Sequence, residues 1–139
     1  MSGPLYLDTS AVLRAVLESG VSPDIEDRIA NAAALITSRL SLVESARAMH
    51  RVRLMGSVPE GRLADAQRDL GRLWARCDVW ELTEAVCRLA CDVAPRTRLR
   101  TLDALHLATY LHARERLPGL ELLTADARMR KAADSDTGG

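Results

Sequence analysis

The pattern on which the fold depends lies near the start of the chain, in Leu5-Tyr6-Leu7-Asp8-Thr9-Ser10-Ala11-Val12-Leu13. Three consecutive apolar residues, Leu5 to Leu7, are typical of a short buried strand, and this strand ends in Asp8. Residues 11–17 then place apolar side chains at helical spacing. A buried strand that leads directly into a helix begins a βαβ unit, so we predict an α/β fold.

The same alternation of strand and helix continues along the chain. Further strands are expected at residues 33–38, 78–82 and 120–124, and helices at residues 22–31, 39–55, 59–76, 84–95 and 101–111, with a last short helix that begins at Asp126. Right-handed βαβ crossovers place helices on both faces of a parallel sheet. The predicted architecture is therefore three layers, α/β/α, around a central parallel sheet.

Length and composition limit the class of protein. The 139 residues, 47% hydrophobic and 27% charged, predict one globular domain, residues 1–139. No apolar stretch approaches the roughly 18 residues that a membrane span needs, and the first residues do not resemble a signal peptide. We therefore expect a cytoplasmic protein with no membrane partner. The net charge is zero, but eighteen of the nineteen basic residues are Arg, which is suited to bidentate phosphate contacts.

Other side chains that could carry chemistry are scattered. Cys77, Cys87 and Cys91 form no zinc pattern with a nearby histidine, and we interpret them as small buried apolar side chains. His106 lies three residues past Asp103 on a mostly apolar helix, where a role in the core or at an interface is favoured over catalysis. The chain has no glycine-rich phosphate loop and no Phe, which argues against a base-stacking platform.

Four acidic residues lie close to the points where helices begin. Asp8, Asp103 and Asp126 each stand at a junction that leads into a helix, and Glu44 lies just inside another helix. Asp8 and Asp126 directly follow predicted strands, so strand order places them, with Glu44, at the carboxyl edge of the sheet, where open α/β folds keep their sites. Asp103 begins a helix that leads into a strand, so only its helix N-terminus supports the same placement.

Each acid also has an ordinary structural explanation. Each aspartate could simply cap its helix. Glu44 could belong to an exposed, salt-bridged face with Arg47 and Arg51. The apolar face of that helix would then be formed by Leu42, Val43, Ala46 and Leu54.

The four acids taken together favour a metal site. Clustered carboxylates raise one another's pKa unless a cation compensates, and hard oxygen ligands favour Mg²⁺ or Mn²⁺. Such a site predicts hydrolysis of phosphate esters by metal-activated water, without a covalent nucleophile.

Hydroxyl groups flank these acids. Thr9 and Ser10 follow Asp8 directly, and Thr124 stands two residues before Asp126. No combination of Ser, His and Asp around them suggests a nucleophile. We expect Thr9 and Ser10 to hydrogen-bond Asp8 or a water bound by the metal, and Thr124 to support the site in the same way.

Four motifs follow one another along nearly the whole chain. They are Leu7-Asp8-Thr9-Ser10-Ala11, Ser41-Leu42-Val43-Glu44, Arg100-Thr101-Leu102-Asp103-Ala104-Leu105-His106-Leu107-Ala108 and Leu123-Thr124-Ala125-Asp126. In order and spacing they resemble a PIN-domain protein and, more narrowly, a VapC-type toxin of a bacterial VapBC toxin–antitoxin system. The resemblance implies an endoribonuclease that depends on Mg²⁺ or Mn²⁺, is usually a homodimer, and is held inactive by a cognate VapB-type antitoxin.

The resemblance also assigns residues. It implies that Asp8, Glu44, Asp103 and Asp126 are the catalytic acids that hold the metal, which gives Asp103 the support that its position alone lacks. It implies a PIN-like sheet of four to five strands, although the tail, residues 132–139, is too polar for a typical fifth strand. Arg96, Arg98 and Arg100 are expected to contact RNA phosphates, or equally to form a solvated loop. The helices at residues 40–54 and 63–74 offer surfaces for a dimer or for the antitoxin.

Two other functional classes remain open. A catalytically inactive PIN-like module that binds a protein partner is disfavoured because all four acids are present. A phosphate-handling α/β domain is disfavoured by two positions. A receiver domain would need an aspartate at the end of the third strand, where Leu82-Thr83 stand, and a haloacid-dehalogenase-like hydrolase would need one at position 10, where Ser10 stands.

Overall fold

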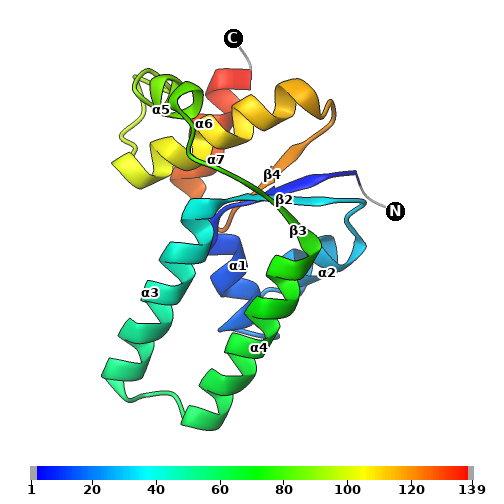
Figure 1. Cartoon of the computed structure of the whole chain (residues 1–139), viewed down its shortest axis with the longest axis vertical. Helices are drawn as coiled ribbons and strands as arrows, with labels where there is room; N and C mark the ends of the chain where they lie inside the picture. Colours follow the sequence, from blue (N-terminus) through cyan, green and yellow to red (C-terminus); the bar gives the residue numbers. More distant parts are fainter. Residues whose placement is uncertain (1–2, 138–139) are drawn as a thin grey trace.

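Four short strands pair in parallel into one central sheet, in the order β3-β2-β1-β4 (Figure 1). The strands are β1 (Leu5–Leu7), β2 (Leu35–Ser38), β3 (Cys77–Trp80) and β4 (Glu121–Leu123). The structure is a computed structural model that describes residues 3–137.

Helices cover both faces of this sheet (Figure 1). They are α1 (Thr9–Val16), α2 (Pro23–Asn31), α3 (Arg39–Met55), α4 (Glu60–Arg76), α5 (Glu84–Ala90), α6 (Thr101–Arg116) and α7 (Ala127–Thr137). Helices α1 to α4 lie on one side and α5 to α7 on the other. The predicted α/β/α sandwich around a parallel sheet is confirmed. None of the helices in the described part of the chain is long and apolar enough to cross a membrane.

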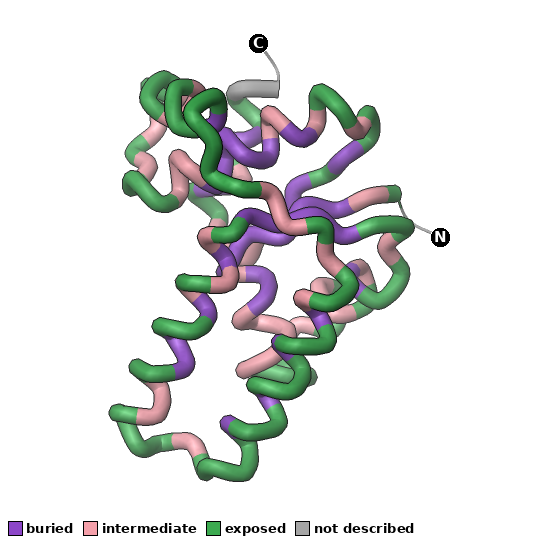
Figure 2. Tube along the Cα trace, in the orientation of Figure 1, coloured by how far each residue is buried: buried purple, intermediate pink, exposed green. Residues whose placement is uncertain are grey.

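The alternation of side chains along the strands builds two separate cores. Leu5 and Leu7 of β1 face helices α1 to α4, and Tyr6 between them faces the opposite layer, because successive residues of a strand point to opposite sides. Ile36 and Leu122 join Tyr6 in that second core. The sheet is therefore buried on both faces, as Figure 2 shows.

The strand order creates one place where the chain changes direction across the sheet. From β1 the chain proceeds to β2 and then β3 on one side, whereas β4 pairs with the other side of β1. Crossovers that run in opposite directions place their helices on opposite faces, which leaves a crevice outside the carboxyl ends of β1 and β4. Asp8 and Thr124 lie directly after these two strands, at this switch point.

Several element boundaries differ from the predicted ones. β3 begins at Cys77 and ends at Trp80, because it pairs residue for residue with β2, whose last residue, Ser38, lies opposite Trp80. Helix α5 ends at Ala90, where the chain enters turns that include Ala94 with a φ of 41°. The sheet has four strands among residues 3–137, within the predicted four to five, because the polar segment from residue 132 continues helix α7.

The face of α3 that packs into the protein also differs from the prediction. Val43 and Leu54 of the expected apolar face are exposed, and the buried residues are instead Ser41, Ser45, Ala48 and Met49. Helices α3 and α4 form a hairpin that projects from the sheet (Figure 1), so contacts with α1 and α4 decide which side of α3 is covered. Small side chains on that side permit close packing.

The cysteines are also less buried than predicted. Cys87 and Cys91 are exposed, and Cys77 is only partly covered. Burial nevertheless raises the pKa of the Cys77 thiol to about 11. The interpretation of these residues as buried apolar side chains was therefore wrong for Cys87 and Cys91.

Candidate active site

Asp8 is fixed at the turn from β1 into α1 by three hydrogen bonds. Its Oδ1 accepts from the backbone N–H of Ala11 at 3.1 Å and from Ser10 Oγ at 2.7 Å, and its Oδ2 accepts from Thr124 Oγ1 at 2.6 Å. The residue is only 3% exposed. Asp8 is thus the N-cap of α1, as the structural alternative proposed, but its second oxygen is held by a side chain from the far end of the sequence.

Asp126 occupies a similar position before α7. Its Oδ1 accepts from the backbone N–H groups of Arg128, at 2.9 Å, and Met129, at 3.4 Å. Thr124 Oγ1 accepts from the backbone N–H of Asp126 at 3.0 Å while its own hydrogen goes to Asp8. Thr124 therefore links the two aspartates across the switch point, and both are half-buried or buried there.

Glu44 reaches this edge from the second turn of α3. Its Oε1 accepts from Thr9 Oγ1 at 2.6 Å and lies 2.6 Å from His106 Nε2. Burial alone would raise the pKa of Glu44, but hydrogen bonds from His106 and Thr9 and the charge of Arg51 outweigh it and lower the pKa. Glu44 makes these inward contacts and, within residues 3–137, no ion pair with Arg47 or Arg51, so the exposed salt-bridged face is not what the structure contains.

Asp103 lies in the first turn of α6 and is partly exposed. Burial, followed by the negative charge of Asp126, raises its pKa, and Asp8 adds to the rise. Arg100 and His106 act in the opposite direction without cancelling it, and the Arg100 guanidinium is 3.7 Å from the Asp103 carboxylate. The charges of Asp126 and Asp8 therefore influence the pKa of Asp103.

These acids surround one edge of the sheet but do not form a closed cage. Within the described part of the chain, no three His, Cys, Asp or Glu side chains are disposed to hold one ion together. The donors present are carboxylate and hydroxyl oxygens, and burial together with the charges of Asp126 and Asp8 raises the pKa of Asp103 among them.

The chemistry of this donor set decides which ion it fits. Mg²⁺ commonly keeps several waters and takes only one or two carboxylates, so it does not require a closed cage. The oxygen donors fit Mg²⁺ or Mn²⁺, for which Asp8, Glu44, Asp103 and Asp126 would supply ligands directly or through bound water. They do not fit structural zinc, which takes Cys and His ligands.

Two residues at this edge were not predicted from the sequence. His106 is 2% exposed and lies between Glu44 and the hydroxyl of Tyr6, which is 2.9 Å from its Nδ1. The sequence favoured a core or interface role for His106 and did not single out Tyr6. One signal was available, since Asp103 and His106 are three residues apart and so share one face of their helix.

The remaining predicted site residues are at the rim. Arg96, Arg98 and Arg100 are exposed in the segment that precedes α6. Arg100 reaches Asp103, as described above, so this segment borders the acids. Ser10 and Thr124 contact Asp8 as expected, whereas Thr9 donates to Glu44.

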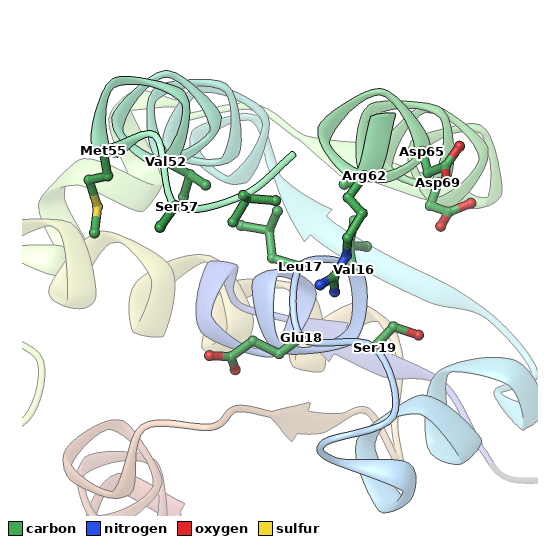
Figure 3. Close-up of a pocket in the computed structure, with 12 residues that line it drawn as sticks. Val16, Leu17, Glu18, Ser19, Val52, Met55, Ser57, Arg62, Asp65 and Asp69 are labelled. Carbon is green, nitrogen blue, oxygen red and sulfur yellow. The ribbon is translucent and has the colours of Figure 1, made fainter. Parts of the chain in front are cut away.

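A separate hollow lies at the other end of α1, between α1 and the α3–α4 hairpin (Figure 3). It encloses about 440 Å³. Its apolar lining includes Val16, Leu17, Val52, Met55 and Val58. Its charged lining includes Arg62, Asp65 and Asp69. Because an eight-residue helix is about 12 Å long, this hollow is distinct from the acids at the start of α1.

Comparison with known proteins identifies the family. Residues 5–135 match the PIN domain family. Ribonuclease VapC35 of Mycobacterium tuberculosis is 35% identical over 133 residues, which cover 94% of this chain and 90% of that protein. Ribonuclease VapC45 of the same species is 31% identical, over 93% of this chain and 88% of its own.

Solved structures share the fold. PAE2754 from Pyrobaculum aerophilum aligns with a TM-score of 0.62 at 22% identity, over 93% of this chain and 78% of that one. VapBC2 from Rickettsia felis, bound to a DNA fragment from its promoter, aligns with a TM-score of 0.56 at 15% identity, over 88% of this chain and 99% of that one. With its parallel sheet, its acids at the switch point and these relatives, the chain belongs to the PIN-domain family, among the VapC-type proteins.

Proposed function

We propose that this protein is a metal-dependent endoribonuclease toxin that hydrolyses RNA phosphodiester bonds. The observation that carries the proposal is the joint arrangement of three aspartates. Thr124 donates a hydrogen bond to Asp8 and accepts one from the backbone N–H of Asp126, and burial followed by the charges of Asp126 and Asp8 raises the pKa of Asp103. The relatives at 35% and 31% identity, which are named ribonucleases, support the same reaction.

Each acid has a distinct part in this proposal. Asp8 is held rigid by its three donors, and Glu44 stays ionised because its hydrogen bonds lower its pKa. Asp103 and Asp126 add two further carboxylates, and burial and then the charge of Asp126 raise the pKa of Asp103. A bound Mg²⁺ or Mn²⁺ would balance that charge and supply the Lewis acid that lowers the pKa of the attacking water and stabilises charge on the phosphate.

RNA would approach along the exposed segment before α6. Arg96, Arg98 and Arg100 stand there without burial and border the acids. Arg guanidinium groups bind phosphate through parallel hydrogen bonds, so this segment suits the backbone of an RNA strand. Such contacts position the strand and carry no base preference of their own.

The proposed partners follow from the VapC-type relatives. We propose a VapB-type antitoxin as the protein that keeps the enzyme inactive, because proteins named VapC match over most of this chain. A homodimer and a cytoplasmic location remain predictions. The exposed apolar side chains Val43, Leu54 and Met55 of the α3–α4 hairpin are available for contacts between proteins.

The proposed function predicts that Asp8→Asn abolishes RNA cleavage. Asparagine can still accept the hydrogen bond from the backbone N–H of Ala11, so α1 keeps its cap, but the negative charge is lost. We expect cleavage of total RNA in the presence of Mg²⁺ to fall by at least about 100-fold, within the range typical of lost electrostatic stabilisation. Gel analysis of RNA fragments and mapping of their 5′ ends measure this loss.

Asp27→Asn serves as the matched control. Asp27 lies exposed on α2, so its variant loses the same charge without touching the site. It should cleave RNA as the unmodified chain does. Full cleavage by Asp8→Asn would contradict the proposal, and a wild-type chain that neither cleaves RNA nor binds Mn²⁺ would favour the inactive PIN-like module.

A further inference from the structure

Three side chains from three elements form a chain of hydrogen bonds that leads from the core to the acids. The Tyr6 hydroxyl of β1 is 2.9 Å from Nδ1 of His106 on α6, and Nε2 of the same ring is 2.6 Å from Oε1 of Glu44 on α3. Thr9 Oγ1 lies 3.1 Å from Nε2 and 2.6 Å from the same carboxylate oxygen. Tyr6 and His106 are buried.

The donors and acceptors give this chain a direction. The Glu44 carboxylate can only accept, so the hydrogen between it and His106 belongs to Nε2. In the tautomer with its hydrogen on Nε2 alone, Nδ1 accepts a hydrogen bond from the Tyr6 hydroxyl. Burial, and then the charge of Asp8, raise the pKa of Tyr6 well above its ordinary value, so the hydroxyl keeps the hydrogen that it donates.

The two carboxylate oxygens of Glu44 differ in their hydrogen bonds. Oε1 receives hydrogen bonds from both His106 and Thr9, whereas Oε2 receives none from the described part of the chain. We propose that Tyr6 and His106 are positioning residues, which hold Glu44 by Oε1 so that Oε2 is presented to the divalent cation. This inference rests on the proposed function, since it assumes that Glu44 is a ligand.

A purely structural role would not require a hydrogen-bonded tyrosine and histidine at the positions of Tyr6 and His106. The core around Tyr6 includes the apolar side chains of Ile36, Leu107, Leu122 and Met129, and beside its hydroxyl lie the buried polar side chains of Ser38 and Thr109. Polar side chains in such surroundings must be fully hydrogen-bonded to avoid a large penalty, and an apolar pair would fill the space without that condition. Hydrogen bonds that orient a ligand from behind are a known means of tuning metal sites.

Removing one hydroxyl tests the inference with little change in packing. Tyr6→Phe deletes the hydroxyl that lies beside Nδ1 of His106. Tyr110→Phe deletes the hydroxyl of another tyrosine in the same core, which donates a hydrogen bond to Leu120 O at 3.2 Å. We expect calorimetry on the full chain without RNA to show a Kd for Mn²⁺ about 10-fold higher for Tyr6→Phe, at the lower end of the effect of such partners. Tyr110→Phe should bind Mn²⁺ as the wild-type chain does.

Two further measurements separate positioning from loss of structure. His106→Gln retains an N–H that can reach toward Glu44, so it should recover part of the Mn²⁺ affinity that His106→Leu loses. Two-bond ¹H–¹⁵N correlation spectra of the metal-free protein should show His106 with its hydrogen on Nε2, and Tyr6→Phe should lose the predominance of that form. Circular dichroism checks that each variant is folded.

The outcomes distinguish this inference from the proposed function. If the wild-type chain and Tyr6→Phe bind Mn²⁺ equally, or if the His106 hydrogen lies on Nδ1, the positioning role is overturned and the metal-dependent enzyme stands. If the wild-type chain binds no Mn²⁺, both are overturned. A 10-fold loss in Tyr6→Phe that also occurs in Tyr110→Phe would show a general effect of the core and would overturn the inference as well.

Discussion

The surroundings of Asp103 disfavour its ionised form. Its pKa is raised in the folded protein, first by burial and then by Asp126. An acid that holds its proton more tightly when folded than when unfolded lowers stability as pH rises through the folded pKa, because the unfolded chain releases the proton more readily. The destabilisation is absent below the unfolded pKa of about 3.9 and complete above the folded one.

Asp103→Asn is therefore expected to stabilise the metal-free protein at pH 7. The carboxylate is partly exposed and screened, so the gain should be below about 1 kcal/mol, a rise in Tm of roughly 1–4 °C. At pH 3 the difference should vanish, because the aspartate is then protonated in both states. Thermal unfolding followed by circular dichroism at both pH values measures this, with Asp27→Asn as the control. A Tm that falls at pH 7 would show that Arg100 stabilises the ionised form more than the acids oppose it.

The residues differ in how far the sequence could place them. Asp8 and Asp126 could be placed because they directly follow strands, and neighbouring strand ends must meet. Glu44 was ambiguous, because helical spacing alone permits both an exposed face and an inward one, and the contact with His106 that decides between them spans 62 residues. Tyr6 could not be assigned a role, because a tyrosine in a buried strand is equally typical of a core.

Two glycines of the α3–α4 hairpin differ in backbone conformation, one at the end of α3 and one inside α4. Gly56 follows α3 with a φ of 69°, and a Cβ added there would meet no atom within 4 Å. A substitution at this position would therefore act through the backbone alone. Gly71 lies inside α4, and a Cβ there also meets open space, but its backbone is helical.

Alanine at these two glycines should change stability in opposite directions. Gly56→Ala forces a side chain into the left-handed conformation and should lower the free energy of unfolding by about 1–2 kcal/mol. Gly71→Ala restricts the unfolded chain and suits the helix, so it should raise the free energy of unfolding by about 0.4–1 kcal/mol. Urea titration gives both values. Equal effects in the two variants would contradict the assignment of Gly56 as the helix terminator.

The bounds of an element could be predicted where a local sequence signal sets them. They could not be predicted where pairing with a strand distant in the sequence sets them. The bounds of α3 matched the prediction of residues 39–55, because Gly56 ends the helix by a local rule. The bounds of β3 did not, because Ser38 of a neighbouring strand limits its length. The buried side of α3 was also mispredicted, because contacts with α1 and α4 cover Ser41, Ser45, Ala48 and Met49 and leave Val43 and Leu54 exposed.

At the scale of the whole molecule, the acids come from both helical layers, which contact each other beyond the carboxyl edge of the sheet. Glu44 comes from α3 on one face, whereas Asp103 and His106 come from α6 on the other. The hydrogen bond between His106 and Glu44 joins these layers directly. A cation held by acids from both layers would tie them further, so its binding should appear as stability of the whole fold.

Mn²⁺ is accordingly expected to raise the Tm of the wild-type chain. At a free concentration 100 times its Kd, a ligand that binds only the folded state contributes about 2.7 kcal/mol, a shift of roughly 8–13 °C for a domain of this size. The shift should shrink as pH falls, because the carboxylates must lose their protons to bind, and the raised pKa of Asp103 makes proton competition begin at a higher pH than for an ordinary aspartate. Differential scanning fluorimetry with and without Mn²⁺ measures the effect. Asp8→Asn should abolish the shift and Asp27→Asn should keep it, and an equal shift in both would place the Mn²⁺ away from the carboxyl edge of the sheet.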